Sequence, residues 1–319
     1  MGLDIGGSKL ACVEGTQDAH ILQRAELPTQ GASPFRQSIP AICGLVESQL
    51  KEARRAGRSV VALSVSVGGP LRIKEGVLVD PPHLPGWHGA HLKRELSECF
   101  PGLPVYIEHD GNAGALAEFH FGAGKLRPNL QHLVFLTFGT GLGAGIVVHG
   151  QIVHGATDTA GEVGHWRLSP DGPEAYGKCG SWEALASGAG LRQLALQRFP
   201  HKWNRTTQVS ELIEAMVSND PDALTIAAEA GEWMGRGIAL LIDVLNPELI
   251  VLGSLAVVLG DRVLGAARRI IAKEALSVAA TACEIVPAVL GRRIGDVASL
   301  MAALTDPAFL SRLQTMNPP

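Results

Sequence analysis

Short apolar runs, separated by glycine turns and by stretches of helical periodicity, make up most of this chain. Residues 60–67 and 249–252 are almost wholly apolar or small, which is typical of strands buried on both faces. Residues 34–56 place apolar side chains three to four positions apart, which predicts a helix. The same reasoning predicts a strand at 104–110 and helices at 112–122, 220–245 and 294–304.

One pattern occurs twice along the chain. Residues 3–13 and 132–148 each have the pattern of a strand, a glycine turn and a second strand, and the two turns lie about 130 residues apart. Because strands alternate with helices throughout, the expected fold class is α/β. The repeated hairpin predicts two similar halves.

The composition is that of a folded protein with a large core. Of 319 residues 46% are hydrophobic, the net charge is −4, and no run of lysine and arginine offers a surface for nucleic acid. The five scattered cysteines contain no C-x-x-C pair and indicate reduced thiols. No signal peptide or membrane-spanning stretch is visible. We therefore expect a cytoplasmic protein that binds neither nucleic acid nor membrane.

The 38 glycines exceed the usual share of about 7%, and they gather at a few turns. A glycine turn exposes successive backbone N–H groups, and such nests bind phosphate. The chain has no G-x-x-x-x-G-K-[ST] motif, and a strand follows the turn at 139–144, which disfavours a P-loop and a dinucleotide-binding fold. Two nests could hold one polyphosphate from both sides. The alternative is that both are only hairpin turns.

Acidic and imidazole side chains accompany these turns. Asp4 precedes the first nest, where it would hold Mg²⁺ or cap the turn. Asp110 joins a strand to a helix, where it would accept a proton from an attacking hydroxyl or cap the helix. Glu162, His165 and Glu183 suit hydrogen bonds to sugar hydroxyls, although such residues in loops are more often solvated.

Taken in order, these segments resemble the ROK family of sugar kinases and regulators, within the actin- and hexokinase-like ATPases. The motifs that match cover nearly the whole chain: D-I-G-G-S-K from Asp4, G-G-P from Gly68, L-P-G-W from Leu84, E-H-D-G-N-A from Glu108, T-F-G-T-G-L-G-A-G from Thr137, A-G-E-V-G-H from Ala160, W-E-A-L-A-S-G from Trp182, and N-P-E from Asn246 through Gly253. The ordered set is far more specific than any one motif.

The resemblance implies two ribonuclease-H-like (actin-like ATPase) domains with an active-site cleft between them. The small N-terminal domain would span residues 1–118 and be completed by the C-terminal helix at about 295–319, and the large domain would span 119–294. Family members often form dimers, so a homodimer is expected.

The resemblance also implies ATP-dependent phosphorylation of a hexose, glucose first, at the 6-hydroxyl, with Asp110 as general base. Sugar binding would fall to Gly69, His109, Glu162, His165 and Glu183. The nucleotide, with Mg²⁺ bridged through its phosphates near Asp4, would be bound by Asp4, Gly6, Gly7, Ser8, Lys9, Thr137, Gly139, Thr140, Gly141 and Gly253. N-acetylmannosamine, N-acetylglucosamine and fructose are alternative sugars, and polyphosphate is an alternative donor.

Two departures from the family pattern concern the site. His109 stands where the family usually has Asn at a sugar contact, so sugar preference stays open. The three cysteine positions of the family's zinc site hold Glu174, Tyr176 and Ser181, and Cys179 is out of register. We therefore expect no structural zinc, and packing by aromatic side chains such as Tyr176 would order this loop.

A repressor, a sugar sensor and an ATPase that acts on proteins are the alternatives to a sugar kinase. Only three residues precede Asp4, where family repressors carry a DNA-binding module, so a repressor of that type is not expected. A sugar-sensing protein without catalysis is disfavoured by the intact Asp4 and Asp110. An ATPase that acts on proteins would leave Glu162, His165 and Glu183 unexplained.

Overall fold

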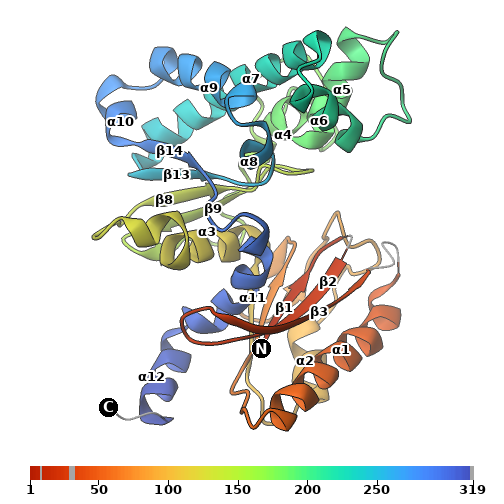
Figure 1. The fold of residues 1–319 in the computed structure, drawn as a ribbon, viewed down its shortest axis with the longest axis vertical. Helices are drawn as coiled ribbons and strands as arrows, with labels where there is room; N and C mark the ends of the chain where they lie inside the picture. The colour runs from red at the N-terminus through yellow and green to blue at the C-terminus, as the bar shows by residue number, and fades with distance from the viewer. Residues whose placement is uncertain (8, 29–32, 317–319) are drawn as a thin grey trace. The chain divides into compact units, whose positions relative to one another are not determined.

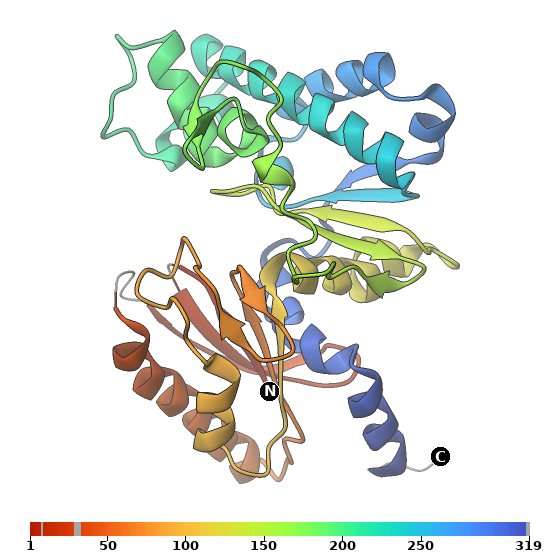
Figure 2. The same cartoon turned by 180° about the vertical axis from the view of Figure 1, so that it is seen from behind.

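The computed structural model describes residues 1–7, 9–28 and 33–316, and Ser8, one of the expected phosphate-binding residues, lies outside them. The chain forms two compact units (Figures 1 and 2). Unit 1 comprises Met1–Phe121, His154–Ala160 and the residues from Arg292 onward, and unit 2 comprises Gly122–Val153 and Gly161–Gly291. In the described ranges, no helix is both long enough and apolar enough to cross a membrane.

Unit 1 is built on a five-stranded sheet with the strand order β3-β2-β1-β4-β7. Strands β1, β2 and β3 form an antiparallel meander, whereas β1, β4 and β7 are parallel. All residues of β4 are buried, as the apolar run predicts. The bounds are β1 (Gly2–Ile5), β2 (Lys9–Gly15), β3 (Ile21–Pro28), β4 (Leu63–Val67) and β7 (Val105–His109), with a small hairpin of β5 (Leu71–Arg72) and β6 (Val77–Leu78).

Helices cover both faces of the unit 1 sheet. On one face lie α1 (Phe35–Arg55) and α2 (Leu92–Cys99); on the other lies α11 (Ile294–Leu304), with α3 (Asp110–Phe121) packed beside it (Figure 1). Helix α12 (Pro307–Met316) follows α11. Glycines in the sheet let α11 approach closely, because a Cβ on Gly2 would lie 2.3 Å from Ser299 Oγ. The C-terminal segment thereby belongs to the core of unit 1.

Unit 2 repeats the same arrangement with the strand order β10-β9-β8-β13-β14. Its first three strands are again an antiparallel meander, and β8, β13 and β14 are parallel. The bounds are β8 (Leu133–Leu136), β9 (Ala144–Val148), β10 (Gln151–Ile152), β13 (Leu249–Leu252) and β14 (Glu284–Pro287). In each sheet the order runs third, second, first, fourth, fifth, which confirms the α/β class and the two similar halves.

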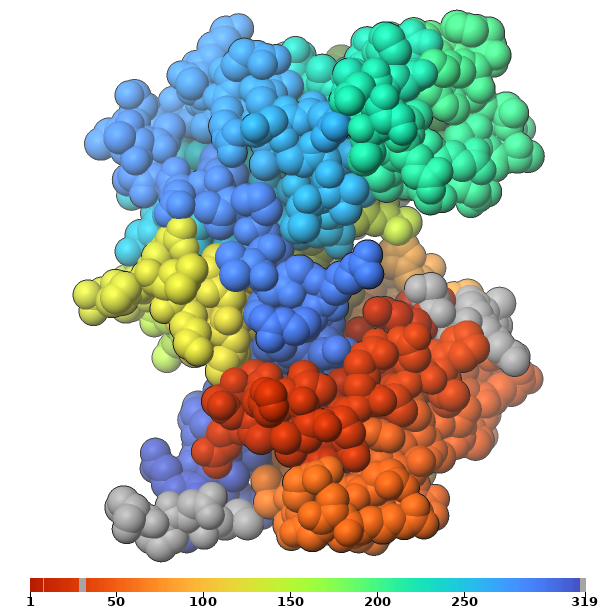
Figure 3. All heavy atoms as spheres, in the orientation of Figure 1, coloured from red at the N-terminus to blue at the C-terminus, as the bar shows by residue number. Residues whose placement is uncertain are grey.

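Seven helices of the described chain belong to unit 2, and their atoms form much of the surface seen in Figure 3. Helix α7 starts at the predicted cap, where the Asp220 carboxylate accepts from two backbone N–H groups, and ends at Asn246, which is left-handed with φ 43°. The bounds are α4 (Trp182–Ala186), α5 (Gly188–Arg198), α6 (Val209–Val217), α7 (Pro221–Leu245), α8 (Leu255–Leu259), α9 (Asp261–Glu274) and α10 (Ser277–Ala282). Short 3₁₀ turns lie at Ala123–Leu126, Val163–His165 and Gly291–Arg293.

Candidate active site

The carboxyl ends of β1, β4 and β7 meet at one edge of the unit 1 sheet. The last residues of these strands are register partners, so Gly6, Gly68 and Asp110, which follow them, come side by side. A Cβ on Gly68 would lie 3.6 Å from Asp110 Oδ2. Ligands of open α/β sheets bind at this edge. The unit 1 motifs, distant in sequence, are thus gathered in one place.

Asp110 is the first residue of α3, and its side chain is 54% exposed. Its Oδ1 accepts from the N–H of Gly111 at 2.7 Å, which fixes the carboxylate and leaves Oδ2 toward Gly68. Nδ1 of His109 accepts from the same N–H at 3.2 Å, so the neutral ring carries its proton on Nε2. That edge of the ring lies against Gly69, where a Cβ would come within 2.4 Å of His109 Cδ2.

Glu108 forms a buried network beneath this edge, which the sequence did not reveal. Its carboxylate accepts from the backbone N–H of His109 and from Asn112 Nδ2, each at 2.9 Å, and bonds to His154 Nε2 at 2.8 Å. The bond to Glu108 raises the pKa of His154. Residues 154–160 are further held by Asp158, which accepts from the N–H of Ile73. This segment supports β7, which ends at His109 and leads directly into Asp110.

Asp4 lies in the same edge of unit 1. Burial, with the negative charge of Asp110 as the next cause, raises its pKa from 3.8 to about 7, and Lys9 partly opposes the rise. A Cβ on Gly295 would lie only 2.8 Å from Asp4 Oδ2, so the glycine leaves room around the carboxylate. Hard carboxylate oxygens suit Mg²⁺, so Asp4 is a residue of this edge that could hold the ion.

The first glycine turn is closed by a bond from the N–H of Gly6 to the carbonyl of Lys9 at 3.0 Å. Gly7 passes under the loop that follows β6, since a Cβ there would lie 2.9 Å from the carbonyl oxygen of His83. Glycine is therefore needed at position 7 for close packing.

In unit 2, the loop between β8 and β9, residues 137–143, lies at the equivalent edge of the sheet. Thr137 closes it: its backbone N–H donates to the carbonyl of Gly143 at 2.9 Å, and its Oγ1 accepts from the N–H of Gly143 at 2.8 Å. Leu136 and Leu252 are register partners, which brings Gly253 to the base of this loop. The expected nucleotide residues of unit 2 (Thr137, Gly139, Thr140, Gly141 and Gly253) are thereby brought together.

The sugar-side candidates of unit 2 lie against this loop. Glu183 is in α4, and its Oε2 accepts from the N–H of Leu142 at 2.9 Å. His165 ends the short 3₁₀ turn that Glu162 precedes. Tyr176 stacks on the His165 ring with a centroid distance of 3.6 Å and an angle of 20°. Its hydroxyl lies near Glu183, since a Cβ on Gly164 would be 3.3 Å from both the Tyr176 hydroxyl oxygen and Glu183 Cβ. Burial raises the pKa of Tyr176 and keeps it a neutral donor.

The residues at the family's zinc positions do not fit a site of three cysteines and one histidine. Ser181 caps α4, Tyr176 lies on His165, and Glu174 starts the strand β11 (Glu174–Ala175), which pairs with β12 (Lys178–Cys179). Among the described residues, no three His, Cys, Asp or Glu side chains gather as metal ligands. The expectation of a zinc-free loop is a prediction that metal analysis can test.

Known proteins are similar to this chain over most of its length. Residues 1–305 match the ROK family. A glucokinase of Streptomyces coelicolor is 31% identical over 287 residues, which are 84% of this chain and 86% of that protein. A xylose repressor of Caldicellulosiruptor bescii is 31% identical, over 71% of this chain and 58% of that protein. An N-acetylmannosamine kinase of Salmonella arizonae is 34% identical, over 61% and 63%.

Solved structures agree. The ROK hexokinase from Thermus thermophilus has a TM-score of 0.78 and 30% identity, with 94% of this chain and 96% of that chain covered. A ROK family glucokinase from Streptomyces griseus, in complex with glucose and AMPPNP, has a TM-score of 0.77 and 27% identity, with 93% and 96% covered. These likenesses confirm the fold class of two actin-like ATPase domains and support a sugar kinase. A family match over 305 of 319 residues shows that the chain belongs to the ROK family.

Proposed function

We propose that this protein is a cytoplasmic kinase that transfers the γ-phosphoryl group of ATP to the 6-hydroxyl of a hexose, with glucose as the first choice. The observation that carries the proposal is the exposed Asp110 carboxylate at the edge of the unit 1 sheet, beside the turns at Gly6 and Gly68. The glucokinase relative at 31% identity supports the same substrate class.

Phosphoryl transfer needs positioned reactants and neutralised charge more than covalent chemistry. Asp110 Oδ2 accepts the proton of the attacking hydroxyl, while Oδ1 keeps its bond to Gly111. Backbone N–H groups of the two glycine turns bind phosphate oxygens. Mg²⁺, brought with the nucleotide, would be held near Asp4 and would neutralise phosphate charge.

Sugar hydroxyls both donate and accept, so a set of carboxylates and imidazoles can bind them. Glu162, His165 and Glu183 of unit 2 and His109 of unit 1 take this role in the proposal. His109 offers an N–H at Nε2, and this donor bears on the choice among hexoses and acylhexosamines. The N-acetylmannosamine kinase relative keeps that second substrate class in the test.

The test is ADP release with a panel of glucose, mannose, fructose, N-acetylmannosamine and N-acetylglucosamine, with a parallel arm that supplies polyphosphate. Asp110→Asn is compared with Asp171→Asn, an exposed loop residue, as the matched control. We expect Asp110→Asn to lose about 10²–10⁴-fold in rate and the control to lose nothing.

A wild-type protein that binds sugar but phosphorylates none would contradict the kinase and favour a sugar sensor, the class to which the xylose repressor relative points. Light scattering on the same preparation tests the proposed homodimer. A stoichiometric zinc signal would contradict the zinc-free loop.

A further inference from the structure

The loop between β8 and β9 rests on the segment that carries the sugar-side candidates of unit 2. The backbone of this loop and of the first residue of β9 is tied at four points. Leu142 N–H donates to Glu183 Oε2 (2.9 Å), and Ala144 N–H donates to the Gly161 carbonyl (2.8 Å). The Gly139 and Thr140 carbonyls accept from the N–H groups of Gly188 (2.8 Å) and Ala189 (3.1 Å). Two glycines, Gly161 and Gly164, are in close contact with this backbone. A Cβ on Gly161 would lie 2.0 Å from the Ala144 oxygen, and one on Gly164 would lie 2.2 Å from the Leu142 oxygen.

Of these four ties, only the one to Glu183 involves a side chain. The other three join backbone groups to backbone groups. The Glu183 carboxylate has two oxygens and can accept from several donors, so a sugar hydroxyl can share it with the Leu142 N–H. Any movement of this carboxylate on sugar binding therefore reaches the nucleotide loop directly.

Tyr176 lies beside that carboxylate. A Cβ on Gly164 would be 3.3 Å from both the Tyr176 hydroxyl oxygen and Glu183 Cβ, and the Tyr176 ring stacks on His165. Burial and the interaction with Glu183 raise the pKa of Tyr176, so its hydroxyl is a donor for the carboxylate. Both contacts come from a two-residue turn between β11 and β12, in which Tyr176 and Gly177 have φ of 57° and 66°. Turns of this type favour Asn and Gly, because positive φ is strained for a bulky side chain.

A tyrosine kept in a strained position points to a role for that side chain. We propose that Tyr176 is a positioning residue that, through Glu183 and the Leu142 N–H, couples occupation of the sugar site to the affinity of the nucleotide loop. This inference rests on the proposed sugar and nucleotide sites. Coupling between two ligands is reciprocal, so each ligand tightens the other by the same factor.

The test measures binding of a non-hydrolysable ATP analogue with and without the sugar that the panel selects. Tyr176→Phe removes the hydroxyl and keeps the stack, and Tyr106→Phe, at the other tyrosine of the chain, is the matched control. We expect Tyr176→Phe to reduce the coupling factor by about three- to ten-fold, the effect of one lost bond to a charged group near solvent. Affinity for the analogue alone stays within about two-fold.

A second variant separates this role from simple loop stability. Tyr176→Asn suits the positive φ of the turn, so it leaves the hairpin at least as stable while losing both contacts. We expect it to lose the coupling at least as fully as Tyr176→Phe. Wild-type coupling in either variant overturns the proposal.

A failure of the proposed function would be visible separately. If no sugar binds the wild-type protein, the kinase proposal fails, and the positioning role is then judged by hydrogen exchange at the Leu142 amide without sugar. Faster exchange in Tyr176→Phe, with Tyr106→Phe unchanged, supports the role of Tyr176. Equal exchange in all three proteins overturns it.

Discussion

At the scale of single residues, Asp4 combines a candidate functional role with a cost in stability. Its pKa is about 7 in the folded chain, against an ordinary 3.8. Between these two pH values the folded chain binds more protons at this site than the unfolded chain. Its contribution to the free energy of unfolding is therefore favourable at low pH, falls as pH rises from about 4 to about 7, and is level above that.

Asp4→Asn tests this directly. We expect the variant to be more stable than the wild type by about 1–3 kcal/mol at pH 8, because no buried charge has to form, and to lose the advantage near pH 4. Urea unfolding at both pH values measures the difference, with Asp171→Asn as control. If Asp4→Asn were less stable than the wild type at pH 8, the charged Asp4 carboxylate would not lower the free energy of unfolding. Activity should fall in the same variant.

Some residues of the candidate site could be predicted from the sequence, and others could not. Asp110, Glu183 and the glycine turns could be singled out as candidates, because motifs of fixed spacing mark them, and their roles stay predictions. His154 could not be predicted from the sequence. Its bond to Glu108 joins residues 46 positions apart, and no sequence motif includes His154. Tyr176 was expected only to pack. Its position beside Glu183 depends on the positive φ angles of the turn between β11 and β12, which the sequence Tyr-Gly does not predict.

At the scale of elements, the turn at Val163–His165 is wedged against the loop between β8 and β9. Gly164 has no positive φ, so substitution there tests sterics alone: the added Cβ would lie 2.2 Å from a backbone oxygen. We expect Gly164→Ala to destabilise the protein by about 2–4 kcal/mol and to weaken nucleotide binding.

Gly44 in the middle of α1 is the matched control, because a Cβ there meets nothing within 4 Å. Gly44→Ala should stabilise the helix by about 0.5–1 kcal/mol, since glycine costs more backbone entropy than alanine. Thermal unfolding of the two variants should therefore move in opposite directions. If both variants instead changed the unfolding temperature in the same direction, the loop between β8 and β9 would have moved to make room for the added Cβ of Gly164→Ala at no cost in stability.

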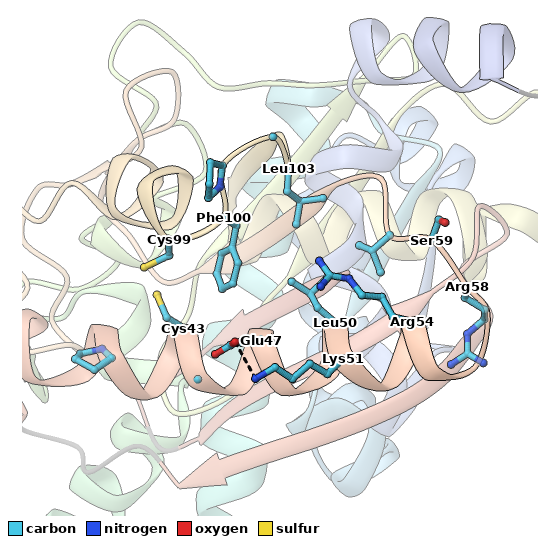
Figure 4. A pocket seen from close by; sticks show the side chains of 15 residues that line it. Cys43, Glu47, Leu50, Lys51, Arg54, Arg58, Ser59, Cys99, Phe100 and Leu103 are labelled. Carbon is cyan, nitrogen blue, oxygen red and sulfur yellow. Dashed lines mark ion pairs between the residues drawn. The ribbon is translucent and has the colours of Figure 1, made fainter.

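Helices α1 and α2 each contain one cysteine, Cys43 and Cys99. Cys43 of α1 and Cys99 at the end of α2 lie at the wall of a cavity of about 890 Å³, and Figure 4 shows their sulfurs pointing toward each other. Burial raises the pKa of Cys43 to about 12, so the exposed Cys99 reacts first with an oxidant. Hydrogen peroxide takes one hydrogen from each thiol, giving one disulfide and two waters.

We expect this disulfide to raise the free energy of unfolding by about 2–4 kcal/mol, because it closes a long loop in the unfolded chain. Intact mass reads the loss of two hydrogens, and non-reducing peptide mapping identifies the pair. Cys43→Ser is the control that should leave Cys99 oxidised alone. Further oxidation of Cys99 in the wild type, with Cys43 still free to alkylation, would show that the thiols cannot join.

Elements with strong local signals could be predicted from the sequence. Strand β13 is wholly apolar, and α7 has a capping Asp220 and a stop at Asn246. Helix α5 has only the capping Ser187 as a local signal, because it begins with the glycine-rich G-A-G. Backbone bonds to the loop between β8 and β9 hold its first turn. Tertiary contacts rather than propensity make it a helix.

At the scale of the whole molecule, the repeated hairpin in the sequence predicts the repeated sheet topology. Residues 154–160 belong to unit 1 although their neighbours in sequence belong to unit 2, and neither composition nor periodicity predicts this. Asp158 and His154 hold it through contacts to residues more than forty positions away. The segment is thus fixed by side chains of unit 1 that come together only in the folded chain, which a linear pattern does not describe.

The two units have separate hydrophobic cores, which predicts that damage to one core leaves the other intact. Trp87 is the only tryptophan of unit 1, so in a Trp87→Phe background the remaining four report on unit 2. Ile250→Ala and Leu3→Ala each open a cavity at a fully buried site, in unit 2 and unit 1 respectively. Each should cost its own unit about 2–5 kcal/mol. We expect tryptophan fluorescence to show an earlier urea transition for Ile250→Ala and an unchanged one for Leu3→Ala. Equal shifts for both variants would mean that the units unfold as one cooperative body, and the four passages of the chain between them would then be the connections that enforce it.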